Sequence, residues 1–133
     1  PALDRMLSRI QNDLFDLGSR VAACAAESAR AAEFPAARIA QLEEWIDRFQ
    51  EQLPPLKEFI LPSGSLAGAT LHLARSVSRR TERRLVDLAE AGTVRDLQDE
   101  LIYLNRLSDL LFVLARLTNQ LAGVSETAWT VTR

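Results

Sequence analysis

An unusual concentration of arginines lies in the stretch LHLARSVSRRTERR, residues 71–84. It contains Arg75, Arg79, Arg80, Arg83 and Arg84 with a single acid, Glu82, although the formal net charge of the chain is −2. On a helix Arg75, Arg79 and Glu82 share one face, and Arg83 extends that face by one turn. Neighbouring like charges repel, so a cluster of this kind is favoured where it binds an anion such as triphosphate.

A second interpretation of the cluster is an ordinary solvated face, or a set of ion pairs with acids on neighbouring helices. The composition bears on the chemistry in either case. Of the 16 basic residues only Lys57 is a lysine. An anion site in this chain would therefore be built mainly from guanidinium groups, which bind phosphate oxygens in pairs.

A polar line also runs through the leucine-rich segment near the C-terminal end. Its members are Asn105, Asp109, Phe112 and Arg116, at offsets of four, seven and eleven residues. Asn105 could bind a base or a sugar, and Asp109 could orient an arginine. The alternative is a buried polar network that fixes the register of the helices.

Other kinds of site have little support in the sequence. His72 is the only histidine, so a histidine-pair metal site and the Glu-x-x-His motif of di-iron bundles are excluded, and no metal site is predicted. Cys24 is the only cysteine, which excludes an internal disulfide and favours a reducing compartment. Phosphate-loop, dinucleotide-binding and serine-hydrolase motifs are absent.

The length and composition fit one domain, residues 1–133, with a core of its own. The chain is 47% hydrophobic and 26% charged, and no apolar run approaches the ~18 residues that span a bilayer. Aromatic residues make up only 6%, and the part outside the arginine cluster is acidic. Nucleic-acid binding is therefore disfavoured.

Leucine spacing predicts four helices and an all-α antiparallel bundle. The expected segments are residues 3–17, ended by Gly18 as a C-cap, residues 35–53, ended by Pro54-Pro55, residues 66–91, and residues 94–122. Residues 19–34 are expected to form a variable connection, with a partly helical one as the alternative, and the apolar loop LKEFILPSGS (56–65) is expected to require burial. Ser65 is expected to cap the third helix.

The apolar positions also predict which faces are buried. For the third helix the expected core side is Leu66, Leu73, Val77, Leu85 and Leu88. The last helix is apolar on two faces, one with Leu101, Leu104, Leu111 and Ala115, the other with Leu107, Leu110, Leu114, Leu117 and Leu121. A helix apolar on most sides is usually buried on most sides, which suggests a second partner surface and oligomerisation.

Four segments, in order, resemble the PduO-type ATP:cob(I)alamin adenosyltransferases. They are RIQNDLFDLGS (9–19), FILPSGS (59–65), LHLARSVSRRTERR (71–84) and YLNRLSDLLFVLAR (103–116), and the tail GVSETAW (123–129) is also similar. The resemblance implies a five-helix bundle assembled as a homotrimer with active sites between subunits. It implies transfer of the 5′-deoxyadenosyl group of ATP to the cobalt of cob(I)alamin, with release of triphosphate.

The resemblance also implies roles for individual residues. ATP binding is implied for Arg79, Arg80, Thr81, Glu82, Arg83 and Asn105. Arg75 matches an arginine that supports catalysis and pairs with an acid on the first family helix. Phe59 matches the aromatic residue beneath the corrin ring, which displaces the lower axial ligand of cobalt and makes reduction to Co(I) easier.

ATP with Mg²⁺ and cobalamin are the implied ligands, and the implied protein partners are a cob(II)alamin reductase or flavoprotein and an adenosylcobalamin-dependent acceptor enzyme. Membrane and nucleic-acid partners are not expected. The implied location is the bacterial cytoplasm, or the mitochondrion of a eukaryote. Two departures stand out: the family's N-terminal phosphate loop (TKTGDxGxT) and its VDELN helix are expected to be missing here, and Ser63 replaces a more usual glycine.

Three other functions stay open on the sequence alone. The first is a non-enzymatic helical oligomerisation or interaction domain whose arginine-rich face meets acidic partners. The second is nucleic-acid binding by the basic helix. The third is storage or delivery of a corrinoid without catalysis.

Overall fold

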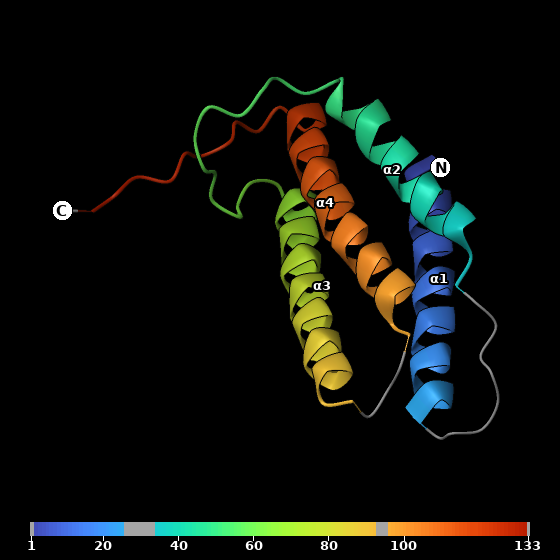
Figure 1. The fold of residues 1–133 in the computed structure, drawn as a ribbon. Coiled ribbons are helices and arrows are strands. Elements are labelled where there is room, and N and C mark those ends of the chain that lie inside the picture. Colours follow the sequence, from blue (N-terminus) through green and yellow to red (C-terminus); the bar gives the residue numbers. More distant parts are fainter. Residues whose placement is uncertain (1, 26–33, 93–95, 133) are drawn as a thin grey trace.

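Helix α4 forms the centre of the molecule, and the other helices pack around it (Figure 1). The computed structural model describes residues 2–25, 34–92 and 96–132, which form α1 (Ala2–Ala25), α2 (Ala36–Gln50), α3 (Leu66–Glu90) and α4 (Gln98–Leu121). The neighbouring helices α3 and α4 run antiparallel. The all-α bundle predicted from the sequence is therefore confirmed for the described residues. None of their helices is long and apolar enough to cross a membrane.

The apolar character of α4 is explained within one chain. Both predicted faces contribute to the core, through Leu104, Leu107, Leu110, Leu111, Leu114, Ala115 and Leu117, whereas Leu121 is exposed. Because α3 and α2 already pack against α4, its apolar pattern does not by itself require a second partner surface, and oligomerisation stays a prediction.

The first helix does not end where the sequence suggested. Gly18 was expected to be a C-cap, but α1 continues to Ala25. A glycine within a helix costs only ~1 kcal/mol relative to alanine, and a tertiary contact can outweigh that. Here Arg20 Nε donates to the buried Glu100 Oε1 of α4 at 2.9 Å, which fixes the turn after the glycine. Residues 26–33 of the expected connection lie outside the described part of the chain.

The start of α3 and the end of α2 agree with the predicted signals. Ser65 is the N-cap of α3, and its side chain accepts a hydrogen bond from the Gly68 amide. Helix α2 stops shortly before Pro54-Pro55. For α4, Asp96 and Leu97 precede its first residue, and residues 93–95 are not among those described.

The buried face of α3 differs in part from the predicted one. The prediction is confirmed near the C-terminal end, where Leu85 is buried and Leu88 packs against the core. Leu66, Leu73 and Val77 are exposed, and Gly68, His72 and Ser78 are buried in their place. Small side chains let two helix axes approach closely, so the side of α3 with glycine and serine lies against α4. The exposed leucines and valine form an apolar stripe on α3.

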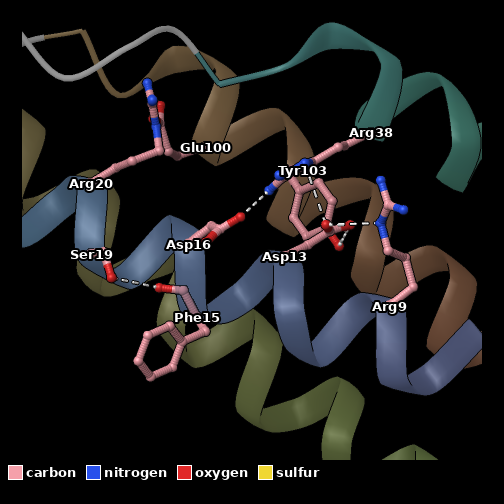
Figure 2. A network of polar contacts seen from close by, with 9 residues as sticks. All are labelled: Arg9, Asp13, Phe15, Asp16, Ser19, Arg20, Arg38, Glu100 and Tyr103. Carbon is pink, nitrogen blue, oxygen red and sulfur yellow. Dashed lines mark hydrogen bonds and ion pairs between the residues drawn. The ribbon is translucent and has the colours of Figure 1, made fainter.

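A buried acid, Asp13, joins α1, α2 and α4 (Figure 2). Its carboxylate accepts a hydrogen bond from the Tyr103 hydroxyl at 3.1 Å and forms ion pairs with Arg9 and Arg38 at 3.3 and 3.4 Å. Burial, followed by the charge of Asp13, raises the pKa of Tyr103. The phenol therefore stays protonated and remains a donor. The network satisfies a buried charge, which is costly when unpaired.

Replacing Tyr103 with phenylalanine is expected to lower the free energy of unfolding by about 1–2 kcal/mol, because a buried carboxylate oxygen loses its neutral donor while its arginines remain. Urea denaturation of the two proteins measures the difference. Ser19→Ala is a matched control, since the Ser19 hydroxyl donates to the Phe15 carbonyl on an exposed turn. A Tyr103→Phe loss no larger than the control loss would contradict a stabilising role for this network.

Candidate functional site

The predicted arginine cluster lines an open groove of about 660 Å³ beside α3 and α4. The lining residues are Arg79, Arg80, Glu82, Arg83, Arg84, Val86, Asp87 and Asn105. Within the part of the chain that is described, none of the four arginines forms an ion pair with an acid. Four guanidinium groups therefore face two carboxylates, an excess of positive charge suited to an anion with several oxygens.

Asn105 connects the arginine helix to α4. Its Nδ2 donates to Glu82 Oε1 at 3.1 Å, and its Oδ1 accepts from Arg106 Nη2 at 2.6 Å. Arg106 in turn pairs with Asp109 at 2.9 Å, so Asp109 does orient an arginine. Asn105, Arg106 and Asp109 thus form a network at the edge of the groove, whereas Phe112 and Arg116 of the predicted polar line are not among its lining residues. Thr81 lies outside the groove lining and donates to the Val77 carbonyl.

Arg75 lies one turn before Arg79 and stacks on an aromatic ring of α4. Its guanidinium carbon is 5.0 Å from the centroid of the Phe112 ring, which also meets the His72 ring edge-on at 6.0 Å. His72 is 3% exposed, and its Nε2 has no hydrogen-bond partner in the described structure. Burial, and then Arg75, lower the pKa of His72, while Glu126 opposes this shift. The histidine is thereby kept neutral, and Arg75 is held in place by π-stacking.

The acid that the resemblance assigns to Arg75 belongs to a family helix that was not found in this sequence. Among the described acids none pairs with Arg75. That ion pair therefore stays a prediction.

The apolar loop is held by the C-terminal tail rather than buried beneath it. Phe59 is 81% exposed, and its ring meets Trp129 edge-on at 6.4 Å. A short antiparallel pairing joins the two segments: Trp129 N donates to Phe59 O at 2.7 Å, and Leu61 N donates to Thr127 O at 2.8 Å. The loop is therefore not buried within this chain, and its burial against another surface stays a prediction. Exposed aromatic surface on a fixed backbone is typical of a binding site.

The loop and the arginine groove are separate features of one chain. Loop and tail project from the end of the bundle where α3 begins (Figure 1). Thirteen residue steps separate Leu66 from Arg79, which corresponds to a rise of about 20 Å along the helix. Phe59 is not among the residues that line the groove. The structure thus brings Arg79, Arg80, Glu82, Arg83 and Asn105 together, and places Phe59 elsewhere.

Two residues of α4 that hold the loop were not assigned this role from the sequence. Arg116 donates to the Pro54 carbonyl at 2.8 Å and pairs with Glu126 at 2.6 Å. Asn119 binds Ser63 and Ser65. The signal for Asn119 was present, since it continues the polar line from Arg116 by three residues, but nothing local shows that its partners lie more than fifty residues away.

Comparisons with known proteins agree with these features. A family model described as cobalamin adenosyltransferase matches residues 1–118. The chain is 44% identical over 123 residues to the cobalamin adenosyltransferase of Cupriavidus metallidurans, covering 92% of this chain and 63% of that protein. It is 47% identical over 121 residues to the corrinoid adenosyltransferase of Mycobacterium leprae, covering 86% and 62%. The chain thus spans less than two thirds of the length of these relatives.

Solved structures with the same fold come from the PduO-type ATP:corrinoid adenosyltransferase of Lactobacillus reuteri. A variant of that enzyme complexed with cobalamin and ATP has a TM-score of 0.89 and 34% identity, covering 99% of this chain and 70% of the other. A variant complexed with ATP has a TM-score of 0.85 and 36% identity, covering 97% and 71%. On the family match along residues 1–118, this chain belongs to the cobalamin adenosyltransferase family.

Proposed function

We propose that the protein transfers the 5′-deoxyadenosyl group of ATP to the cobalt of cob(I)alamin, forming adenosylcobalamin and releasing triphosphate. Family membership and the names of the relatives support this activity. The observation in this structure that carries it is the groove beside α3, where four guanidinium groups lack acidic partners among the described residues. The oxygens of a triphosphate can accept hydrogen bonds from these unpaired guanidinium groups.

The reaction requires little acid–base chemistry from the protein. The cobalt lone pair of Co(I) attacks the ribose 5′ carbon, a Co–C bond forms, and the C–O bond to triphosphate breaks. Triphosphate leaves with the bonding electron pair. Because negative charge develops on the leaving group, fixed guanidinium groups stabilise the transition state more than the ground state. The protein's main contributions are alignment and this electrostatic stabilisation.

The proposed residue roles follow from the positions in the groove. Arg79, Arg80 and Arg83 bind the triphosphate, and Glu82 holds Asn105, whose amide contacts the nucleoside part of ATP. Thr81, on the same segment of α3, is also assigned to ATP binding. Arg75 stands one turn closer to the loop, stacked on Phe112, where it can neutralise charge near the reacting carbon. The exposed ring of Phe59 covers the lower face of the corrin.

Mg²⁺ is proposed to enter with ATP. This ion is usually held by phosphate oxygens, waters and one or two carboxylates. Glu82 and Asp87 supply carboxylates in the groove lining, which fits such a site. Among the described residues no group of three or more His, Cys, Asp or Glu side chains could hold a metal ion without those phosphates.

A homotrimer with sites between subunits is proposed from the exposed apolar stripe on α3. Leu66, Leu73 and Val77 lie on one side of the helix that also bears the arginines. An exposed apolar stripe beside a candidate site is typical of an interface. The Phe59 loop does not line the groove of its own chain. A second subunit would bring its Phe59 loop toward that groove.

Two protein partners follow from the proposed chemistry. A cob(II)alamin reductase or flavoprotein must supply Co(I), and an adenosylcobalamin-dependent enzyme is the natural acceptor of the product. The location is proposed to be the cytoplasm in a bacterium and the mitochondrion in a eukaryote. The family includes bacterial and mammalian proteins.

Product formation tests the proposed activity directly. The full-length protein, given ATP and cob(I)alamin under strong reduction, is expected to form a light-sensitive cobalt–carbon product. The absence of product under these conditions would contradict the proposed enzymatic activity. Calorimetry with ATP separates the main alternative, because a purely structural interaction domain would give no heat of nucleotide binding.

A further inference from the structure

The side chain of Asn119 is directed entirely at the segment that links the Phe59 loop to α3. It is 2% exposed. Its Oδ1 accepts from the backbone N–H of Ser65 and from the Ser65 hydroxyl, both at 2.9 Å. Its Nδ2 donates to the Ser63 carbonyl at 3.0 Å. One amide of α4 therefore satisfies three groups of residues 63–65.

The backbone around Asn119 is shaped to admit this side chain. A Cβ atom at Gly64 or at Gly68 would clash with the Asn119 amide. Gly64 also has a φ of +124°, which side-chain-bearing residues rarely adopt. Gly68 lies within α3, where glycine is otherwise unfavourable. Both glycines are thus explained by close approach to one asparagine.

The same contact sets the start of the arginine helix. Ser65 Oγ accepts from the Gly68 amide as the N-cap of α3, and it donates to Asn119 Oδ1. A capping residue fixes where a helix begins and in which direction it leaves the loop. Arg75 and Arg79 follow on this helix by about three and four turns.

The rest of the loop is also fixed to the end of α4. Arg116 donates to the Pro54 carbonyl, just before the loop, and forms an ion pair with Glu126, near the start of the C-terminal tail. The Asn119 carbonyl accepts from Val124 N at 2.9 Å, and the tail then pairs with residues 59–61. Phe59 consequently lies between two segments that are hydrogen-bonded to side chains of α4, one at Pro54 and one at residues 63–65.

We propose that Asn119 is a positioning residue, which holds the Phe59 loop and the first turn of α3 in one fixed relation. It does so from a buried position, through Ser63 and Ser65. Its consequence for the reaction is that the Phe59 ring is held in place to meet the corrin, while α3, which bears the arginines that hold ATP, starts at a fixed point and in a fixed direction. This inference rests on the proposed adenosyltransferase activity.

Two substitutions test the role through different atoms. Asn119→Asp is isosteric and keeps the oxygen for Ser65, but it replaces the donor to the Ser63 carbonyl with a second oxygen that repels it. Gly68→Ala leaves Asn119 in the chain and displaces its amide with a methyl group, while improving helix propensity. Gln120→Ala is the matched control, because the Gln120 amide, next to Asn119 on α4, makes one exposed bond to the Gln52 carbonyl.

In the full-length protein both variants are expected to lose about tenfold or more of the rate when the reaction starts from cob(II)alamin with a reductant, since small misplacements of a positioned group have such costs. From preformed cob(I)alamin the loss should be smaller by at least about threefold, and the KM for ATP should match that of the control. Electron paramagnetic resonance of bound cob(II)alamin should show the axial-nitrogen splitting in the variants and not in the parent.

A loss of equal size from both cobalt states, or rates no lower than those of Gln120→Ala, would overturn the positioning role. If Asn119→Asp fails to fold, Gly68→Ala decides the question alone, because alanine favours the helix. A parent protein that forms no product from either cobalt state would instead contradict the proposed function. The two failures are therefore distinguishable.

Discussion

Replacing Arg79 with alanine is expected to lower kcat/KM for ATP by about a hundredfold or more, the scale seen when one fixed donor to developing negative charge is removed. Arg79 is exposed in the groove and lacks an acidic partner among the described residues. Its removal should therefore leave the free energy of unfolding within about 0.5 kcal/mol of the parent value. Steady-state kinetics at varied ATP concentration and thermal unfolding measure the two effects separately.

Arg79→Lys refines the result. Lysine keeps the charge but loses the planar fork that binds two oxygens at once, so an intermediate loss is expected. Arg48→Ala is the matched control, because Arg48 is an exposed arginine of α2 that stacks on Phe49 outside the groove. If Arg79→Ala lost stability and activity in proportion, Arg79 would be a structural residue and the site assignment would be wrong.

Replacing Phe59 with alanine is expected to slow product formation from cob(II)alamin by about a hundredfold, while the rate from preformed cob(I)alamin changes by less than about threefold. Losing a phenyl ring that keeps the lower axial ligand away from cobalt makes Co(II) harder to reduce, because axial ligation sets the redox potential of such centres. A hundredfold effect corresponds to about 120 mV in a one-electron potential. Parallel assays from the two oxidation states measure it.

Phe15→Ala provides the control for loss of an exposed ring. Phe15 on α1 is 78% exposed, close to the value for Phe59, and its side chain points away from the Asp13 network (Figure 2). Both assays should be unchanged in this variant, with the oligomeric state checked by light scattering. Equal rate losses from the two cobalt states in Phe59→Ala would contradict a role in reduction.

Much of the fold could be predicted because its signals are local. Pro54-Pro55 ends α2 and Ser65 caps α3, and the stereochemistry that decides both lies within a few residues of each. The groove was predictable for a similar reason. Its arginines lie on consecutive turns of one helix, so their spacing alone brings them together.

The features that were missed depend on contacts distant in the sequence. Gly18 does not end α1, because Arg20 reaches Glu100, eighty residues further along the chain. Leucine spacing identified Leu85 but not the N-terminal part of the buried face of α3, where Gly68 lies against Asn119 of α4 while Leu66 and Leu73 stay exposed. The role of Asn119 is visible only when its partners in the loop are known.

A crystal structure of the full-length protein with both ATP and cobalamin bound would show most directly whether the α3 arginines hold the triphosphate while Phe59 covers the corrin. We expect guanidinium nitrogens of Arg79 and its neighbours within hydrogen-bonding distance of phosphate oxygens, and the Phe59 ring against the lower corrin face. Arginine and phenylalanine side chains that face bulk water, remote from both ligands, would contradict this expectation.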